Sequence, residues 1–190
     1  LAHVRRWGWR LVDEFCWDHL GGVPGRWSNR FKNSWEPVFH FARRAQIKFD
    51  PMVVGHESDD VIEYHYDNPK THSGFISAGG GPNGGRKHGI ALPSNVLRIG
   101  NAKADPERGH TAEFPADVPG FFIKASSDRS DVVYDPFLGS GTTLIAAEQL
   151  DRRCYAMEID PAYCDVIVRR WEHLTGRKAV LARQAIEVHA

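Results

Sequence analysis

The sequence has few cysteines, no long apolar run and no net charge. Its three cysteines, Cys16, Cys154 and Cys164, lack the paired spacing of a zinc site and indicate reduced thiols rather than a disulfide framework. No apolar run approaches the roughly 20 residues that a membrane-spanning helix needs. Lys plus Arg and Asp plus Glu number 24 each, which argues against an unspecialised basic nucleic-acid binder. These absences predict a cytoplasmic globular protein with neither a membrane segment nor a metal site.

The beginning of the chain also lacks a signal peptide. Residues 1–9 contain no continuous apolar core, and they have the character of sequence from the interior of a domain. We therefore expect the 190 residues to belong to a longer protein.

Charge is distributed unevenly along the chain. Residues 1–48 are rich in Lys and Arg, whereas residues 50–67 carry acidic side chains and contain no Lys or Arg. A polyanionic partner is expected to contact the first section and to avoid the second.

Two predicted strands flank a basic loop in the first section. Residues 9–17 and 36–41 combine aromatic and β-branched residues and predict a hairpin. The loop between them places cations beside an aromatic ring, which suits a phosphate backbone and unstacked bases. Its candidate DNA-binding residues are Arg26, Trp27, Arg30 and Lys32. The alternative is a solvated loop whose Trp27 packs onto the body of the protein, and both interpretations stay open.

Residues 49–105 have the composition of an inserted lobe. They contain few long apolar runs and many glycines, with short strand-like pieces at 61–66 and 95–99. The run from Gly79 to His88 cannot hold regular structure, so it is either a connector or an element that orders on a partner. The histidines of the lobe, His56, His65, His72 and His88, are not paired with other ligands at metal-site spacing.

Predicted helices and strands alternate from residue 110 onwards. A helix is expected to end near residue 126, with i, i+3, i+4, i+7 spacing of Val118, Phe121, Phe122 and Ala125. Strands are expected from 132 and at 154–159, helices at 142–150 and 161–174, and a last strand at 178–181. The helix at 142–150 is expected to bury Leu144, Ile145, Ala147 and Leu150. This alternation is typical of an α/β fold in which helices cover a parallel sheet.

A glycine turn follows the first of these strands. Gly139 and Gly141 allow a sharp turn and a close approach of the backbone to a ligand at the start of the next helix. Thr142 and Thr143 stand where the dinucleotide fingerprint has its third glycine, and the lysine of a phosphate loop is absent. Glu158 follows about 20 residues on, where nucleotide-binding units place the carboxylate that binds ribose hydroxyls. S-adenosylmethionine, which has a nucleoside but no phosphate, fits these features.

Two motifs of this region carry a family resemblance. Residues 135–143 are Asp-Pro-Phe-Leu-Gly-Ser-Gly-Thr-Thr, and residues 158–163 are Glu-Ile-Asp-Pro-Ala-Tyr. Together they closely resemble the S-adenosylmethionine site of the amino-group DNA methyltransferases, which form N6-methyladenine or N4-methylcytosine. Segments 91–97, 110–115 and 171–179 are similar to flanking parts of that family, and segment 9–41 is similar to its late-sheet hairpin.

The resemblance implies a Rossmann-like α/β methyltransferase sheet with an inserted target-recognition lobe. Residues 1–48 would form the late-sheet hairpin, residues 49–105 the lobe and residues 106–190 the cofactor-binding part. Within the last part, Thr142 would hold the amino-acid end of the cofactor, Glu158 its ribose hydroxyls and Asp160 would lie near its adenine ring. The implied cofactor-binding residues are His110, Phe114, Pro115, Asp135, Phe137, Gly139, Gly141, Thr142, Glu158 and Asp160.

The catalytic tetrapeptide of the family is absent from the 190 residues. It consists of Asp, Asn or Ser, then two prolines and an aromatic residue, and in the family order that places the cofactor motif last it would precede Leu1. The resemblance thus implies a bacterial or phage DNA methyltransferase whose catalytic segment lies upstream, with adenine N6 ranked before cytosine N4. Alternatives are an RNA or protein methyltransferase and an inactive S-adenosylmethionine-binding module. Double-stranded DNA is the expected partner, and a second copy of the chain and a restriction enzyme are further candidate partners.

Overall fold

The computed structural model describes residues 6–21, 28–61, 87–101 and 114–181. Arg26, Trp27, His110 and residues 79–86 of the glycine-rich run lie outside the described residues. The chain divides into two compact units, Leu1–Phe49 with Asn95–Ala190 and Asp50–Ser94. The expected lobe boundaries at residues 49 and 105 stay a prediction.

Three strands of the larger unit form a mixed sheet. β1 (Arg10–Asp18) pairs antiparallel with β2 (Trp35–Ala42) and parallel with β5 (Val96–Arg98), in the order β2-β1-β5. Phe15 and Trp17 point to the same face of β1 and are each 6% exposed, as expected for a strand with one face on a core. The predicted hairpin is confirmed by the pairing of β1 with β2.

The second sheet of this unit holds the glycine turn. α2 (Asp117–Ser126) precedes β6 (Val132–Asp135), and α3 (Thr142–Gln149) connects β6 to its parallel neighbour β7 (Arg153–Ala156). α4 (Pro161–Thr175) follows β7 and ends at Gly176, whose φ is 68°. The predicted alternation is confirmed over these elements, and a helix joining two parallel strands makes β6-α3-β7 a βαβ unit.

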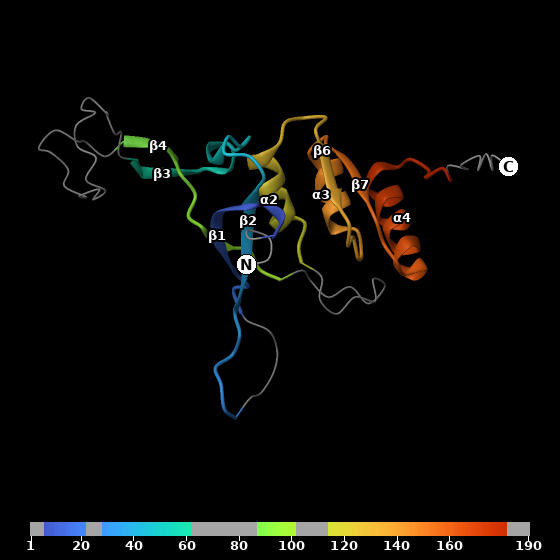
Figure 1. Ribbon diagram of the computed structural model, residues 1–190, viewed down its shortest axis with the longest axis horizontal. Helices are drawn as coiled ribbons and strands as arrows, with labels where there is room; N and C mark the ends of the chain where they lie inside the picture. The colour runs from blue at the N-terminus through green and yellow to red at the C-terminus, as the bar shows by residue number, and fades with distance from the viewer. Residues whose placement is uncertain (1–5, 22–27, 62–86, 102–113, 182–190) are drawn as a thin grey trace, which may run out of the picture. The chain divides into compact units, whose positions relative to one another are not determined.

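α2 contributes to two hydrophobic clusters. Its Val118 belongs to a cluster with Phe15 and Trp17 of the first sheet. Its Ile123 belongs to a second cluster with Ala147 of α3. Figure 1 accordingly shows α2 between the β1–β2 hairpin and α3. The helix therefore holds the two sheets of the unit together.

Three details of the predicted elements are wrong. β7 ends at Ala156 rather than at residue 159, because the N–H groups of Ile159 and Asp160 turn toward the Glu158 carboxylate. In α3 the fully buried side chains include Ala146, which is 1% exposed, whereas Leu144 is only half-buried. The small side chain of Ala146 faces the second cluster, where α2 approaches closely.

The third detail is the predicted strand at 178–181. No strand forms there, although the segment lies within the part of the chain that the structure describes. Instead, Lys178 Nζ and the Ala179 N–H both donate to the Glu172 carboxylate, each at 2.9 Å, and hold the chain against the end of α4. Val180 and Leu181 are 89% and 85% exposed.

The smaller unit contains a short 3-10 helix, η1 (Pro51–Val54), and an antiparallel pair, β3 (His56–Val61) and β4 (Lys87–Ala91). The Asp50 side chain caps η1 by accepting the Met52 N–H. His88 Nδ1 lies 2.8 Å from Asp59 Oδ1 across the pair. The strand-like piece predicted at 61–66 lies outside the described residues except for Val61.

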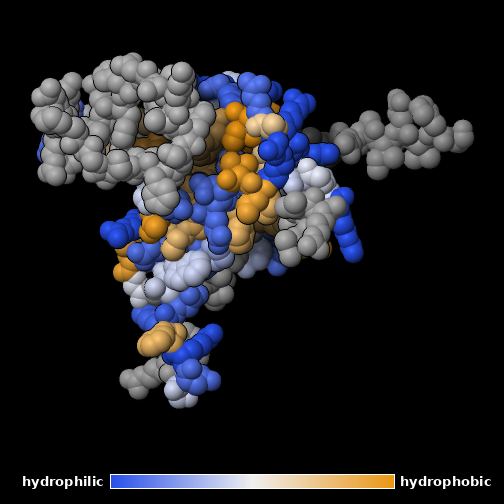
Figure 2. Space-filling model, turned by 60° about the vertical axis from the view of Figure 1, so that its left-hand side comes forward, coloured by the Kyte–Doolittle hydropathy of each residue, from blue (hydrophilic) through white to orange (hydrophobic). Residues whose placement is uncertain are grey.

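The surface of the described residues mixes apolar and polar side chains. Figure 2 shows hydrophobic side chains as separate patches among hydrophilic ones on the face that it draws. The sheet of β6 and β7 contributes several exposed apolar side chains, which include Val132, Tyr134, Tyr155 and Met157. None of the helices in the described ranges combines the length and apolar character that crossing a membrane requires.

Candidate cofactor site

The two parallel strands β6 and β7 end at the same edge of their sheet. Their pairing extends past the strands, because Met157 N donates to Asp135 O and Leu138 N donates to Met157 O, both at 3.0 Å. Asp135 Oδ1 accepts the Phe137 N–H at 2.9 Å and turns the chain out of β6. The carboxyl ends of parallel strands are where open α/β sheets bind ligands. This edge brings the predicted turn and the predicted carboxylate together.

The glycine turn requires left-handed backbone at two positions. Gly139 has a φ of 58° and Gly141 a φ of 93°, and Gly141 N donates to Leu138 O at 3.0 Å. A Cβ atom on Gly141 would lie 3.1 Å from Cγ1 of Ile167 in α4. Gly141 is therefore required both by its dihedral angle and by its close contact with α4.

The Glu158 carboxylate binds the glycine turn directly. Its Oε2 accepts the Gly139 N–H at 2.7 Å, and its Oε1 accepts the N–H groups of Ile159 and Asp160 at 2.9 Å. One side chain thus joins the turn after β6 to the turn after β7. The sequence predicted that Glu158 and the glycines serve one site, and the structure places them in contact.

The N-termini of α3 and α4 differ. Asp160 caps α4 in the usual way, because its Oδ1 accepts the Ala162 N–H at 2.9 Å. α3 begins after Gly141, which has no side chain that could cap the helix. The start of a helix attracts negatively charged groups of a ligand. The α3 end, where the N-cap residue supplies no acceptor of its own, is therefore the one of the two that suits a ligand.

Ser140 and Thr142 lie on the buried side of the turn. Ser140 is 4% and Thr142 is 3% exposed, and their hydroxyl oxygens are 3.4 Å apart. Nη1 of Arg170 in α4 lies 2.6 Å from Ser140 O and 3.5 Å from Thr142 Oγ1. The predicted contact of Thr142 with the amino-acid end of the cofactor stays a prediction, since its hydroxyl lies against the Arg170 guanidinium.

The prediction from sequence missed Arg170. A signal exists in the spacing of α4, because Arg170 follows the half-buried Ile167 by three residues and therefore lies on the inward face of the helix. A cation at such a position requires acceptors inside the protein. Those acceptors are the groups of the glycine turn.

The remaining predicted cofactor residues come from separate elements. Phe137, in the turn after β6, is 88% exposed. Phe114 is 38% exposed, and Pro115 O accepts the Val118 N–H where α2 begins. The cofactor contacts of these residues and of Asp160 stay predictions, and His110 lies outside the described residues.

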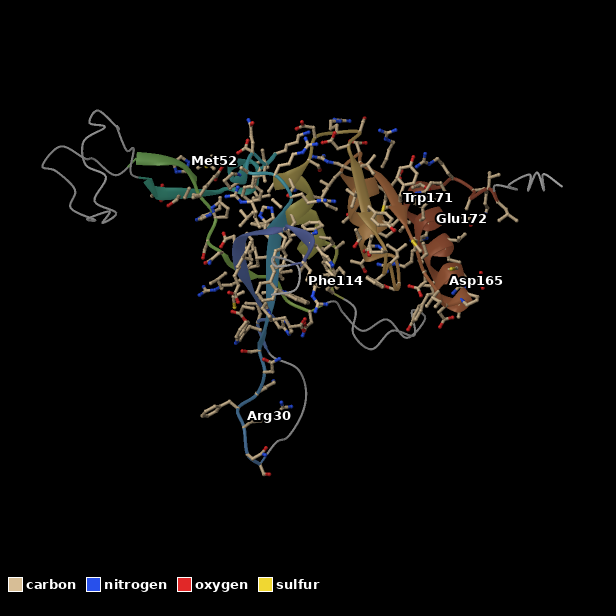
Figure 3. The ribbon with its side chains drawn as sticks, in the orientation of Figure 1. Arg30, Met52, Phe114, Asp165, Trp171 and Glu172 are labelled. Atoms are coloured by element: carbon tan, nitrogen blue, oxygen red, sulfur yellow. The ribbon has the colours of Figure 1, made fainter. Side chains whose placement is uncertain are left out.

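The basic loop is described from residue 28 onwards. Arg30 and Lys32 are exposed, and Phe31 between them is 97% exposed. Figure 3 shows Arg30 on the extended connection between β1 and β2, away from both strands. Phe31 was not predicted as a candidate, although an aromatic residue next to cations is the same signal that pointed to Trp27. Arg26 and Trp27 lie outside the described residues.

Comparison with known families decides the identity. A sequence profile of the N6/N4 amino-group family, described as DNA methylase, matches residues 1–169. The chain belongs to this family. The DNA methylase profile covers the hairpin, the smaller unit and the candidate site, and it confirms the resemblance that the two motifs predicted.

Curated relatives of this DNA methylase are type II methyltransferases. M.PvuII from Proteus hauseri is 28% identical over an alignment of 176 positions that covers 82% of this chain and 52% of the relative. M.Cfr9I from Citrobacter freundii is 27% identical over 164 residues, 86% of this chain and 45% of the relative. The chain therefore spans about half the length of these relatives.

Solved structures show that the fold is that of DNA methyltransferases. PvuII DNA methyltransferase (cytosine-N4-specific) superposes with a TM-score of 0.64 at 24% identity, over 92% of this chain and 58% of that chain. The M1.HpyAVI–SAM complex superposes with a TM-score of 0.58 at 17% identity, over 88% and 65% of the two chains. The predicted α/β class is confirmed at this level.

Among the described residues, no group of three or more His, Cys, Asp and Glu side chains could hold a metal ion. His88 and Asp59 of the smaller unit form a pair only.

Proposed function

We propose that this DNA methylase chain is the S-adenosylmethionine-binding part of a DNA methyltransferase that modifies an exocyclic amine. The observation that carries the proposal is the contact of the Glu158 carboxylate with the N–H of Gly139, 2.7 Å apart. It places the acidic group at the end of β7 against the turn at the end of β6. This is the arrangement that holds a nucleoside in α/β folds.

The residues present fit S-adenosylmethionine by their chemistry. Glu158 supplies a carboxylate for ribose hydroxyls, and the start of α3, whose N-cap residue is a glycine, supplies N–H groups for the carboxylate of the amino-acid end. The site has no lysine in the glycine turn, so a phosphate is a poorer ligand. The bound cofactor supplies a methyl group on a sulfonium, which the lone pair of an exocyclic nitrogen attacks directly. No nucleophilic cysteine is required.

The acceptor is proposed to be adenine N6 or cytosine N4 in double-stranded DNA. Such an atom is reached only when the base leaves the helical stack. The sequence resemblance ranks adenine first, whereas a structural neighbour is named cytosine-N4-specific. The methylated nucleoside that the enzyme produces therefore identifies the target base. We further propose that the catalytic tetrapeptide is supplied by protein outside residues 1–190 and that residues 49–105 recognise the target sequence.

A Glu158→Ala substitution tests the cofactor assignment. We expect the affinity for S-adenosylmethionine to fall about 10- to 100-fold, because hydrogen bonds to a charged group contribute about 1.5–3 kcal/mol. Isothermal titration calorimetry of the 190-residue chain measures the change. Asp165→Asn, which removes an exposed carboxylate from α4, is the matched control and should bind as the parent does.

A second variant separates the two roles of Glu158, which are to hold the glycine turn and to bind the cofactor. Glu158→Gln keeps an oxygen that can accept the Gly139 N–H but loses the negative charge. If it binds S-adenosylmethionine as tightly as the parent, the negative charge of Glu158 is not required for binding. If Glu158→Ala also binds as tightly, the cofactor assignment is wrong.

The methyl acceptor is tested with labelled cofactor and duplex DNA or RNA, using the chain alone and a longer protein that includes any upstream segment. We expect labelled DNA from the longer protein and none from the chain alone. Mass spectrometry of the nucleosides then identifies N6-methyladenine or N4-methylcytosine. Label in RNA or protein instead of DNA would contradict the proposed substrate.

A further inference from the structure

The Arg170 side chain contacts the buried side of the glycine turn through one nitrogen atom. Its Nη1 lies 2.6 Å from Ser140 O, 2.9 Å from Ser140 Oγ and 3.5 Å from Thr142 Oγ1. Ser140 and Thr142 are almost fully buried, at 4% and 3% exposure. Buried oxygens need donors, and a guanidinium can serve several of them at once.

The orientation of the Ser140 carbonyl fixes that of the peptide unit at which α3 begins. The peptide unit between Ser140 and Gly141 is planar, so its C=O and N–H are oriented together. Arg170 holds the C=O end, and Leu138 O accepts the N–H end at 3.0 Å. The peptide unit that begins α3 is therefore held at both ends.

The turn needs this restraint because it lies between two glycines. Gly139 and Gly141 both adopt positive φ, and glycine has more alternative conformations to lose than any other residue. Glu158 holds the Gly139 N–H from the end of β7, and Arg170 holds Ser140 from α4. The β7–α4 segment thus restrains the turn from two sides.

We infer that Arg170 is a positioning residue of the cofactor site: it sets the orientation of the Ser140–Gly141 peptide and the start of α3 before the ligand binds. This inference rests on the proposed function. A turn that is already ordered avoids an ordering cost on binding. Arg170 itself contacts the buried side of the turn, and it acts on the ligand only through the backbone that it holds.

Arg170→Met tests the inference, because methionine keeps much of the side-chain stem and removes every donor. We expect S-adenosylmethionine to bind about tenfold more weakly, at a temperature where the variant is fully folded. Arg170→Lys keeps a cation whose single nitrogen carries several donors, but on a side chain of different length and shape, so it should restore part of the affinity. Arg169→Met, an exposed neighbour on the same helix, is the matched control and should bind as the parent does.

Amide hydrogen exchange without ligand gives an independent measurement. In Arg170→Met we expect the Gly139 and Gly141 amides to exchange faster, while amides in the middle of α2 keep the rates of the parent. If Arg170→Met keeps both the cofactor affinity and the slow exchange of these amides, the positioning role is wrong. If Arg170→Met does not fold, Arg170→Leu, which also removes every donor, takes its place, and unchanged affinity with unchanged exchange has the same meaning.

The two proposals fail in different ways. If the parent chain does not bind S-adenosylmethionine, the proposed function is wrong, and the exchange rates of Gly139 and Gly141 still report on Arg170. If the parent binds and Arg170→Met binds equally well with faster exchange, the ordering of the turn does not limit binding and the inference is overturned.

Discussion

At the scale of single residues, several predicted ligand contacts also hold the site together. Glu158 binds the glycine turn, Asp160 caps α4 and Asp135 closes the turn after β6. Each carboxylate is held by backbone N–H groups and therefore has a defined orientation before a ligand arrives. Such preorganisation is what a binding site requires, and it also means that substituting one of these carboxylates would change both the local backbone and the predicted ligand contact.

Cys154 gives a prediction about reactivity. Burial in β7, and next the nearby negative charge of Asp135, raise the pKa of the Cys154 thiol from 9.0 to about 11. The thiolate is the reactive form, so at pH 8 Cys154 should alkylate much more slowly than the exposed Cys164. Mass spectrometry after a timed exposure to iodoacetamide measures both rates. Because the raised pKa lies above the range tested, the Cys154 rate should keep rising about tenfold per pH unit between pH 8 and 10.

The result that would contradict this prediction is a Cys154 rate equal to that of Cys164 at pH 8. A Cys164→Ser variant serves as the control, because it leaves the Cys154 environment in β7 intact. An alkylation rate of Cys154 that levels off below pH 9 would show that its pKa is not raised.

The residue scale also shows what a sequence can and cannot predict. The glycine positions and Glu158 were predictable because their spacing follows from a strand, a turn and a helix of ordinary length. Arg170 and Phe31 were not predicted. The partners of Arg170 are 30 and 28 residues away, and no local pattern encodes that contact. The Thr142 hydroxyl is buried and faces Arg170 of α4, a contact that the sequence also did not reveal, and its predicted contact with the cofactor stays a prediction.

At the scale of elements, helices with a single apolar face were easier to predict than elements with two sets of contacts. The spacing of Val118 and Phe122 correctly placed one face of α2. Ile123 packs on α3 from another side of the same helix, which a single periodic stripe does not reveal. The strand predicted at 178–181 was wrong because a contact from outside the segment decides its structure. The apolar Val180 and Leu181 suggested strand pairing, whereas the Glu172 carboxylate binds Lys178 and Ala179.

The N-terminal cap of α4 provides a prediction at this scale. Asp160→Ala removes the acceptor of the Ala162 N–H and should lower the free energy of unfolding by about 1 kcal/mol. Asp160→Asn keeps a capping oxygen and should retain most of that stability. Urea unfolding of the three proteins measures the difference. Asp165→Ala, which changes an exposed residue within α4 (Figure 3), should shift stability by less than about 0.5 kcal/mol.

This comparison also separates the cap from the predicted contact near adenine. If Asp160→Asn is as stable as the parent but binds S-adenosylmethionine more weakly, the side chain has a role beyond α4. Equal stability of Asp160→Ala and the parent would show that the cap does not contribute.

At the scale of the whole molecule, the net charge is zero although residues 1–48 form a basic section and residues 50–67 an acidic section. The chain spans about half of its type II methyltransferase relatives, 52% of M.PvuII for example. The fold class and family could be predicted, because the two motifs that resemble the family's cofactor site lie within this half. The target base could not, since the catalytic tetrapeptide is absent from the 190 residues.

The basic connection between β1 and β2 leads to the prediction that tests DNA contact. Arg30→Gln combined with Lys32→Gln should weaken binding to duplexes of any sequence. Each lost phosphate contact should flatten the dependence of log K on log salt by about 0.9, which makes about 1.8 for the pair. Fluorescence anisotropy at several salt concentrations gives the slope. Lys124→Gln with Arg169→Gln removes two exposed cations from α2 and α4 and should leave it unchanged.

Phe31 distinguishes stacking from charge in the same experiment. Its ring is 97% exposed between two cations, and a base that stacks on it would contribute affinity without releasing counterions. Phe31→Ala should therefore weaken binding, by about 1–3 kcal/mol if a full stacking contact is lost, and keep the salt slope of the parent. A double variant of Arg30 and Lys32 with the slope of the parent would mean that this loop is only a solvated connection, because neutral side chains cannot replace two phosphate contacts.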